Sequence, residues 1–238
     1  MKNDSYQRIL LKLSGEMFKG DREYGIDPSF LTYLAEEIKN IKKTNVDLGI
    51  VIGGGNIFRG LAASLNGMDR VTADYSGMLA TIMNSLALNN ALKKINVDSR
   101  IQSSLELKEV TEPFILEKTL HHFSKNRVVI FAGGTGNPYF TTDTTAALRA
   151  VEIKADIILK ATKVDGIYDK DPMIHNDAKK YSILSYLDVL NQKLKIMDNT
   201  ALSLSMDNNI PILVFNLNKK DNIKKAIQKE ELGTLIQA

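Results

Sequence analysis

The sequence predicts an α/β protein, a three-layer α/β/α sandwich built on a largely parallel sheet, in a single domain spanning residues 1–238. Its short apolar runs are continuous rather than alternating, which is typical of parallel strands that are covered on both faces. Amphipathic helical stretches separate these runs, and this alternation is the pattern of layered α/β folds. No repeat, low-complexity segment or linker divides the chain, so we expect one core.

Five apolar runs are expected to form buried strands, at residues 9–11, 48–52, 128–131, 157–159 and 212–215. The stretch 232–236 is expected to add an edge strand.

Helices are expected between these strands. Asp27 and Pro28 supply an N-cap and a proline at the first helical position. Apolar residues then recur at helical spacing, at positions 31, 34, 38 and 41. A second long helix is expected at residues 78–93, and a third after Asp143, where small alanines suit close packing on a sheet.

Composition and charge exclude several classes of protein. Lys plus Arg number 31 against 28 Asp plus Glu, a net charge of +3, which is too mild an excess for a nucleic-acid binder. With no cysteine, disulfides and thiolate metal sites are excluded. The polar amino terminus lacks the apolar region of a secretion signal, and no apolar run is long enough to cross a bilayer. We therefore expect a cytoplasmic protein without membrane or nucleic-acid partners.

Four of the expected strands lead into glycine-rich or charged loops, at residues 12–15, 53–60, 133–138 and 160–166. Ligands of open α/β sheets bind beyond the carboxyl ends of the strands, so these loops fall on one face. Glycines let backbone N–H groups approach an anion, and Lys and Arg offset phosphate charge. A single glycine cluster would be explained equally well as a turn. Four such loops on one face predict a phosphate-binding site.

The common nucleotide and hydrolase motifs are absent. The chain has no G-x-x-x-x-G-K-[ST], no G-x-G-x-x-G and no protein-kinase motif set. No serine, histidine and acid constellation suggests a hydrolase. His121 and His122 are expected at a solvated helix end, and His175 has no metal-ligand spacing, so no metal site of the protein's own is expected.

The sequence resembles the bacterial UMP kinase family, within the amino-acid kinase superfamily, over essentially the whole chain. The resemblance is carried by RILLKLSGE from Arg8, VIGGGNIFRG from Val51, GMDRVTADYSGMLATIMN from Gly67, GGTGNPYFTTDT from Gly133, LKATKVDGIYDKDP from Leu159, KIMD from Lys195 and PILVFNLN from Pro211. The combination of GGGN-x-FRG with TGNPYFTTD is the specific part. The family often carries phenylalanine where Tyr139 stands.

The resemblance implies an ATP site and a reaction, the transfer of the γ-phosphoryl group of ATP to UMP. The ATP-side positions are Lys12, Leu13, Ser14, Gly15, Gly55, Arg59, Thr162, Tyr168 and Asp171. Lys12 is expected to pair with the transferring phosphoryl group; the alternative is a strand-end lysine that reaches water. Arg59 would bind phosphate oxygens or stand in a surface loop, and Tyr168 would stack on a base or pack in the core.

The resemblance also implies an acceptor site for UMP. Its positions are Gly54, Asp74, Thr135, Gly136, Asn137, Pro138, Tyr139, Phe140, Thr141 and Thr142. Asp74 is expected to accept hydrogen bonds from ribose hydroxyls, although a helix cap would look the same in sequence. Tyr139 and Phe140 would form an apolar wall or else pack in the core.

Four residues are expected to act in catalysis: Lys12, Arg59, Asp143 and Asp198. The two aspartates would orient lysines or ordered water. Amino-acid-specific members of the superfamily use a second transfer-site lysine in a segment that this chain lacks, and Lys160 or Lys163 could substitute for it. Mg²⁺ is expected as a cofactor held mainly by ATP and water.

Regulation and assembly are implied by the resemblance alone. They comprise a homohexamer, feedback inhibition by UTP and activation by GTP. The segment matching the one associated with GTP is Gly20, Asp21, Arg22, Glu23, Tyr24 and Gly25, for which a solvated turn is the alternative.

Two other functions remain open from sequence. One is a carbamate or amino-acid kinase of the same superfamily. The other is a nucleotide-binding storage or sensor protein, because one fold hosts many functions.

Overall fold

The structure is a computed structural model, which describes residues 5–60, 67–170, 172, 174, 175, 177–194 and 196–238. Among these residues the strands are β1 (Arg8–Leu13), β2 (Asp47–Ile52), β3 (Ser99–Ser103), β4 (Glu112–Pro113), β5 (Val128–Ala132), β6 (Ile157–Thr162), β7 (Ile183–Ser185), β8 (Ile212–Asn216) and β9 (Thr234–Gln237). The helices are α1 (Gly15–Phe18), α2 (Pro28–Lys42), α4 (Arg70–Lys94), α5 (Leu116–Ser124), α6 (Thr142–Glu152), α7 (Tyr186–Asn191), α8 (Asn199–Asp207) and α9 (Asn222–Ile227).

The described strands form one sheet in the order β4-β3-β5-β2-β1-β6-β8-β9-β7. All pairs are parallel except β8 with β9, which is antiparallel. The α/β sandwich expected from sequence is confirmed. The expectation that residues 232–236 form an edge strand is wrong, because β9 lies between β8 and β7.

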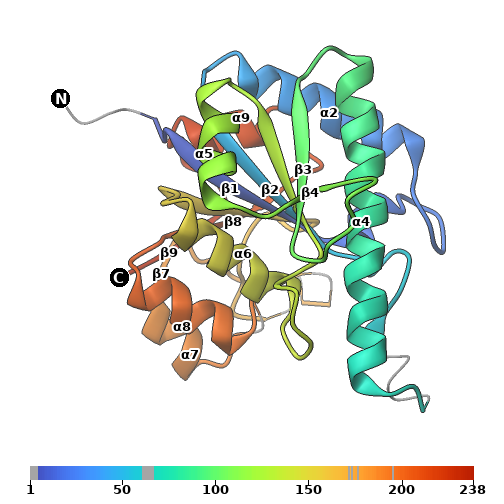
Figure 1. Cartoon of the computed structure of the whole chain (residues 1–238). Coiled ribbons are helices and arrows are strands. Elements are labelled where there is room, and N and C mark those ends of the chain that lie inside the picture. The colour runs from blue at the N-terminus through green and yellow to red at the C-terminus, as the bar shows by residue number, and fades with distance from the viewer. Residues whose placement is uncertain (1–4, 61–66, 171, 173, 176, 195) are drawn as a thin grey trace.

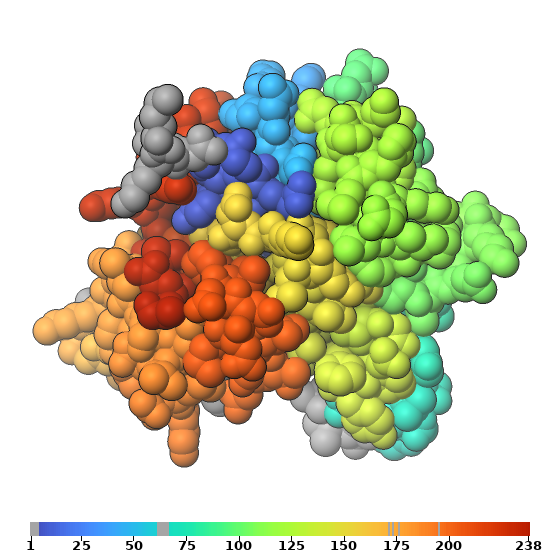
Figure 2. Space-filling model, turned by 60° about the vertical axis from the view of Figure 1, so that its left-hand side comes forward, coloured from blue at the N-terminus to red at the C-terminus, as the bar shows by residue number. Residues whose placement is uncertain are grey.

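Helices cover both faces of the sheet, with α2, α4 and α9 on one side and α5, α6, α7 and α8 on the other (Figure 1). Successive strand residues alternate between two cores: Ile9 and Leu11 pack with α2 and α4, while Leu10 packs with α6. This double burial explains why the strand sequences are continuously apolar. In Figure 2 the yellow segment that includes α6 lies between the orange segment that includes α8 and the green residues around α5.

The helix caps follow the sequence pattern. Asp27 accepts a hydrogen bond from the Ser29 N–H at 2.9 Å, and α2 starts at Pro28 as expected. The helix expected at residues 78–93 begins earlier, at Arg70, because Asp69 caps it through the Thr72 N–H at 2.9 Å.

Several elements were not expected from sequence. The strand β3 reads SRIQS, and its polar residues hide a strand that is largely buried in the sheet. Helix α5 carries the two adjacent histidines in its last turn and ends at Ser124. The expectation of a solvated helix end is wrong for His122, whose side chain is 8% exposed and lies 2.9 Å from the Glu112 carboxylate. Among the described residues, no helix combines the length and apolar character needed to cross a bilayer.

Candidate active site

The parallel strands β1, β2, β5 and β6 end on the same edge of the sheet, and the four predicted loops follow them. A cavity of about 790 Å³ lies beyond the ends of β1 and β6. It is lined by strand-end and loop residues, namely Lys12, Ser14, Glu16, Met17, Lys160, Ala161, Thr162, Lys163, Val164, Gly166, Ile167, Tyr168, Lys170, Pro172, Leu194, Ile196 and Val214. Four of these are lysines, so the cavity suits a polyanionic ligand.

Lys12 and Lys160 lie side by side because β1 and β6 are adjacent parallel strands in which these two residues are register partners. The carboxylate of Asp143, in the first turn of α6, bridges them. Its Oδ1 lies 2.7 Å from Lys12 Nζ, and its Oδ2 lies 3.0 Å from Lys160 Nζ. The Lys160 ammonium also donates to the Ile196 carbonyl. Asp143 thus holds both ammonium groups at the ends of β1 and β6. Of the two lysines considered from sequence, Lys160 is bonded to Asp143, while Lys163 is exposed at the same cavity.

The electrostatics of this triad are set by burial and by mutual charge. Burial lowers the pKa of Lys160 to about 8, and the Lys12 ammonium lowers it as well, against the opposing pull of Asp143. Burial by itself raises the pKa of the Asp143 carboxyl, but the two lysines outweigh it and hold that pKa below its ordinary value. Asp143 is therefore ionised at neutral pH, and the triad keeps a surplus of positive charge directed at the cavity.

Asp198 fixes the helix that carries Asp143. It caps α8 by accepting from the Ala201 N–H at 2.9 Å. Its carboxylate also accepts from the hydroxyls of Thr141 and Thr144, the latter at 3.0 Å. Since Thr141 is the N-cap of α6, Asp198 ties the start of α6 to α8 and so positions the first turn of α6.

Arg59 is held at the surface by an acidic partner. Its Nη2 lies 2.8 Å from Glu16 Oε1, and its side chain is 61% exposed. Glu16 lines the cavity and lies 3.4 Å from Lys19 Nζ as well. The alternative of a surface loop arginine fits its exposure, yet the ion pair places the guanidinium beside a cavity-lining residue.

The glycines of the first two loops are required by close packing. A Cβ at Gly15 would lie 2.6 Å from both the Gly53 oxygen and the Gly55 nitrogen, and one at Gly54 would lie 2.7 Å from the Gly77 oxygen on α4. The end of β1, the loop after β2 and α4 therefore touch through backbone. Leu13 contributes backbone to this contact, since its carbonyl accepts from the Gly53 N–H at 2.9 Å while its side chain is buried in the core.

A pair of buried asparagines locks the same loop in place. Asn56 and Asn84 exchange side-chain hydrogen bonds of 2.9 and 2.7 Å, and Asn84 also donates to the Gly53 carbonyl at 2.8 Å. The Asn56 side chain donates to the Gly25 carbonyl at 2.8 Å, and its backbone carbonyl accepts from the Gly25 N–H at 2.8 Å. Sequence reasoning missed Asn84. The available signal was an amide within the apolar helical stretch ATIMNSLAL.

Asp74 joins α4 to the loop after β5. Its Oδ2 accepts from the Tyr139 N–H at 2.7 Å and from Arg70 Nε at 2.8 Å, and Arg70 lies 5.4 Å from the Tyr139 ring centroid. The helix-cap alternative for Asp74 is wrong, because Asp69 caps α4. The core-packing alternative for the aromatic residues is wrong too: Tyr139 is 65% and Phe140 48% exposed.

The chain is similar to known proteins over nearly its full length. The profile of the family described as "Amino acid kinase family" matches residues 7–216. The chain belongs to the amino acid kinase family. A solved UMP kinase from Bacillus anthracis is 40% identical, with a TM-score of 0.94, over 98% of this chain and 96% of that one.

Two further solved structures are similar to the chain. A UMP kinase from Ureaplasma parvum is 41% identical, with a TM-score of 0.92, over 98% of this chain and 99% of that one. A uridylate kinase from Archaeoglobus fulgidus is 28% identical, with a TM-score of 0.74, over 96% and 99%.

The remaining predicted positions of this amino acid kinase family member fall into three groups. Ser14, Thr162 and Tyr168 line the cavity, as do Lys12 and Lys160 of the triad, and Tyr168 is only half-buried. Asp171 lies outside the described residues. The rest of the predicted acceptor positions form the loop before α6 and the first residue of that helix: Thr135, Gly136, Asn137, Pro138, Tyr139, Phe140, Thr141 and Thr142.

The backbone of that loop is shaped by its own residues. The Thr135 hydroxyl lies 3.2 Å from the Asn137 N–H, which donates to it. Gly136 has φ +83°, a left-handed conformation that favours glycine. Thr141 accepts from the Asp143 N–H at 3.0 Å, so the loop passes directly into α6.

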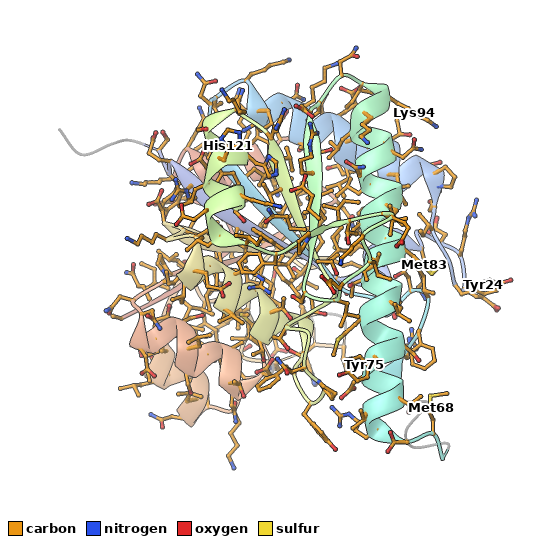
Figure 3. All side chains as sticks on the ribbon, in the orientation of Figure 1. Tyr24, Met68, Tyr75, Met83, Lys94 and His121 are labelled. Atoms are coloured by element: carbon orange, nitrogen blue, oxygen red, sulfur yellow. The ribbon has the colours of Figure 1, made fainter. Side chains whose placement is uncertain are left out.

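Residues 20–25 form the turn after α1, and Tyr24 is 78% exposed there (Figure 3). Within the described residues, no three His, Cys, Asp or Glu side chains gather closely enough to hold a metal ion.

Proposed function

We propose that the chain is a UMP kinase, which transfers the γ-phosphoryl group of ATP to UMP and yields ADP and UDP. The observation that carries the proposal is the Lys12–Asp143–Lys160 triad, placed between the large cavity and the loop that leads into α6. Two UMP kinases, 40% and 41% identical to this chain over nearly its full length, support the choice of acceptor.

The proposed mechanism relies on positioning and charge. An oxygen of the UMP phosphate attacks the γ-phosphorus, and the bond from that phosphorus to the bridging β-phosphate oxygen breaks, leaving ADP. A phosphate oxygen is already a competent nucleophile, so no general base is required. The ammonium groups of Lys12 and Lys160 neutralise the charge that spreads over the transferring group. Asp143 keeps both ammonium groups at the end of the sheet while leaving a net positive charge.

The two substrates are proposed to occupy opposite sides of this triad. ATP would take the cavity with Ser14, Thr162 and Tyr168, with Arg59 closing on phosphate once it leaves Glu16. UMP would contact Gly54 and the loop at residues 135–142, with Asp74 as the acceptor for its ribose hydroxyls. The exposed rings of Tyr139 and Phe140 provide an apolar wall for the base.

Mg²⁺ is proposed to enter with ATP. The cavity lining contains four lysines, and Glu16 is its single carboxylate among the described residues, so the phosphates and water would supply most ligands. When bound, the ion offsets phosphate charge. The side chains of this protein hold and orient the phosphates around it.

Self-association is proposed to build a homohexamer. Helix α4 carries Tyr75, Leu79 and Met83 one turn apart, and they are 41%, 48% and 54% exposed. Figure 3 places Tyr75 and Met83 along this helix at the periphery of the molecule, with Met68 near its start. An apolar stripe of this kind favours contact with a second protein surface. Light scattering of the wild type against Leu79→Lys tests it: an unchanged mass would remove the stripe from the interface.

Regulation and context follow from the resemblance. We propose inhibition by UTP and activation by GTP, with residues 20–25 involved. The paired hydrogen bonds between Gly25 and Asn56 support a link from that turn to the glycine-rich loop. We also propose that the reaction serves pyrimidine nucleotide biosynthesis in the cytoplasm.

A substrate panel tests the proposed function. ADP release from ATP is measured with UMP, CMP, AMP, GMP, glutamate, aspartate and carbamate as acceptors, each with and without GTP or UTP. We expect UMP to be the preferred acceptor. Activity on carbamate or an amino acid but not UMP would assign a different kinase of the family. ATP binding without transfer to any acceptor would favour a storage or sensor protein.

A further inference from the structure

The loop proposed to bind UMP starts with a tight turn that rests on the end of β3. Gly133, Gly134 and Gly136 have φ values of +74°, +59° and +83°. A Cβ at Gly133 would lie 2.8 Å from the Ser103 hydroxyl, and one at Gly136 would lie 3.1 Å from Ser104 Cβ. The turn is therefore shaped by direct contact with the two serines at the end of the neighbouring strand.

Ser104 fastens this turn through its hydroxyl. The Ser104 Oγ–H donates to the Gly134 carbonyl at 2.8 Å, while Arg149 Nη2 donates to the same Oγ at 2.7 Å. A hydroxyl has a single proton, and a guanidinium can only donate. Because Arg149 occupies a lone pair of the oxygen, it directs the Ser104 proton toward the Gly134 carbonyl.

Arg149 is buried and has both an ion-pair partner and an aromatic partner. It is 4% exposed on α6. Its Nη1 lies 2.5 Å from Glu152 Oε2, and its Cζ lies 3.6 Å from the Phe114 ring centroid. A buried guanidinium is costly without such partners. The stacking on Phe114 fixes the plane of the guanidinium group. A lysine could not reproduce this planar set of donors.

The position of Arg149 on α6 connects it to the triad. The same helix carries Asp143 in its first turn and Arg149 near its end, and its N-cap Thr141 is bound by Asp198. Helix α6 thus holds the carboxylate that orients the two lysines and, through Ser104, the turn that begins the acceptor loop.

We propose that Arg149 is a positioning residue for UMP binding, which acts through Ser104 to hold the Gly134 turn of the acceptor loop. The inference rests on the proposed UMP kinase function and deepens it. Nothing in the proposed chemistry requires Arg149 to touch substrate. Its loss should therefore weaken the use of UMP and leave the use of ATP nearly unchanged.

The test combines Arg149→Met, Arg149→Lys, Ser104→Ala and the double variant Arg149→Met/Ser104→Ala. For Arg149→Met and Ser104→Ala we expect kcat/KM for UMP to fall about 10- to 100-fold, as for the loss of a hydrogen bond to a charged group. KM for ATP should change less than about 2-fold, because the cavity lining is untouched. The double variant should lose no more kcat/KM for UMP than the more impaired single variant, because both substitutions break the same chain of hydrogen bonds. Arg149→Lys keeps the positive charge but lacks the planar guanidinium group, so it should recover little of the kcat/KM for UMP.

Arg8→Met provides the matched control. Arg8 also pairs with a carboxylate, at 2.8 Å from Asp47, and lies 5.4 Å from the Phe123 ring centroid, but it is at the opposite end of β1. Its loss should lower the melting temperature without changing KM for UMP.

The outcomes separate the two proposals. An active wild type with unchanged kcat/KM for UMP in Arg149→Met and Ser104→Ala would overturn the inference alone. The inference would also be overturned, in favour of a general structural role, if the losses in kcat/KM for UMP multiplied in the double variant. A rise in KM for ATP as large as the loss in kcat/KM for UMP would overturn it in the same way. If Arg149→Met fails to fold, Ser104→Ala still decides. A wild type that neither binds nor phosphorylates UMP would overturn the proposed function, and this inference with it.

Discussion

The carboxylate Oδ1 of Asp143 lies 2.7 Å from Nζ of Lys12, which joins the first turn of α6 to the end of β1. The same carboxylate holds Lys160 at 3.0 Å on the neighbouring strand β6. Two lysines against one carboxylate leave a net positive charge at the end of the sheet. That surplus suits a transferring phosphoryl group.

Lys12→Ala should lower kcat about 100- to 1000-fold, the effect of removing one preorganised donor from a site of charge development. KM for UMP should change only a few-fold, since Lys12 is assigned to the transferring group. Coupled ADP release measures both constants. The control is Lys42→Ala, which removes another buried lysine, bonded to the Val46 carbonyl outside the cavity. Undiminished turnover in Lys12→Ala would remove Lys12 from the mechanism.

Asp143→Asn should reduce both kcat and stability. It leaves two ammonium groups, 9% and 11% exposed, without their shared countercharge. Breaking a buried ion pair costs about 3–5 kcal/mol of unfolding free energy, and residual solvent access places this case toward the lower end. Urea unfolding monitored by circular dichroism checks it, with Asp177→Asn as a control for an exposed ion pair. Equal unfolding midpoints for Asp143→Asn and the wild type would show that the Asp143 carboxylate does not stabilise the two lysines.

Activity should fall as pH rises through about 8. The pKa of Lys160 is lowered to about 8 by burial, so its ammonium form is present below that pH and is lost above it. The profile of kcat/KM for ATP reports the free enzyme and should show this limb. Lys160→Arg should move the limb to higher pH, because arginine stays charged. Lys42→Arg should leave it in place, although burial also lowers the pKa of Lys42 to about 8.

The lowered pKa of Lys160 also predicts how the free energy of unfolding changes with pH. An unfolded lysine titrates near ~10.4, so between about pH 8 and 10 the unfolded chain binds more protons at Lys160 than the folded one. The free energy of unfolding therefore gains a contribution from this residue as pH rises through that window. Lys160→Arg should remove that contribution, which urea unfolding at pH 8 and 10 would reveal. An identical pH slope in Lys160→Arg and wild type would argue against the lowered pKa.

Asp74→Asn should raise KM for UMP about 10-fold or more, with KM for ATP nearly unchanged. The asparagine oxygen can still accept from the Tyr139 N–H, but the charge that pairs with Arg70 is lost. Asp69→Asn is the control, because it changes a carboxylate one turn earlier that only caps α4. An unchanged KM for UMP in Asp74→Asn would reject the assignment of this residue to the acceptor site.

Gly15→Ala should destabilise the protein and lower kcat, because its Cβ would lie 2.6 Å from backbone atoms that cannot move independently. Gly77→Ala is the matched control on α4, where a Cβ would meet nothing within 4 Å. A helical Gly→Ala change of this kind stabilises by about 0.5–1 kcal/mol. Thermal unfolding of Gly15→Ala and Gly77→Ala checks this prediction. Equal melting temperatures would show that the backbone around Gly15 shifts at little cost in free energy.

Local sequence patterns predicted the central strands and the glycine-rich or charged loops at one edge of the sheet, because both depend on neighbouring residues. Continuous apolar runs identify strands such as β1 and β6, and the loops at their ends follow from parallel topology. The strand β3 was missed because Ser, Arg and Gln dominate it. The place of β9 inside the sheet depends on the addition of β7, a short strand with little pattern of its own.

The pairings within the site were harder to predict. Whether Lys160 or Lys163 meets Asp143 depends on the register of β1 with β6 and on which lysine faces α6. The pairs Asn56–Asn84 and Arg149–Ser104 join segments that are distant in the chain, and no spacing rule identifies them. Glycines at 15 and 54 were assigned to ligand contact, and the structure adds that backbone packing alone requires them.

Transfer of the γ-phosphoryl group to UMP with the help of Lys12 is measured directly by ³¹P NMR of ATP and UMP incubated with the wild type and with Lys12→Ala. We expect the wild type to form UDP and ADP in equal amounts, and Lys12→Ala to form UDP about 100- to 1000-fold more slowly. ATP converted to ADP and inorganic phosphate without UDP, or UDP formed at the wild-type rate by Lys12→Ala, would contradict this expectation.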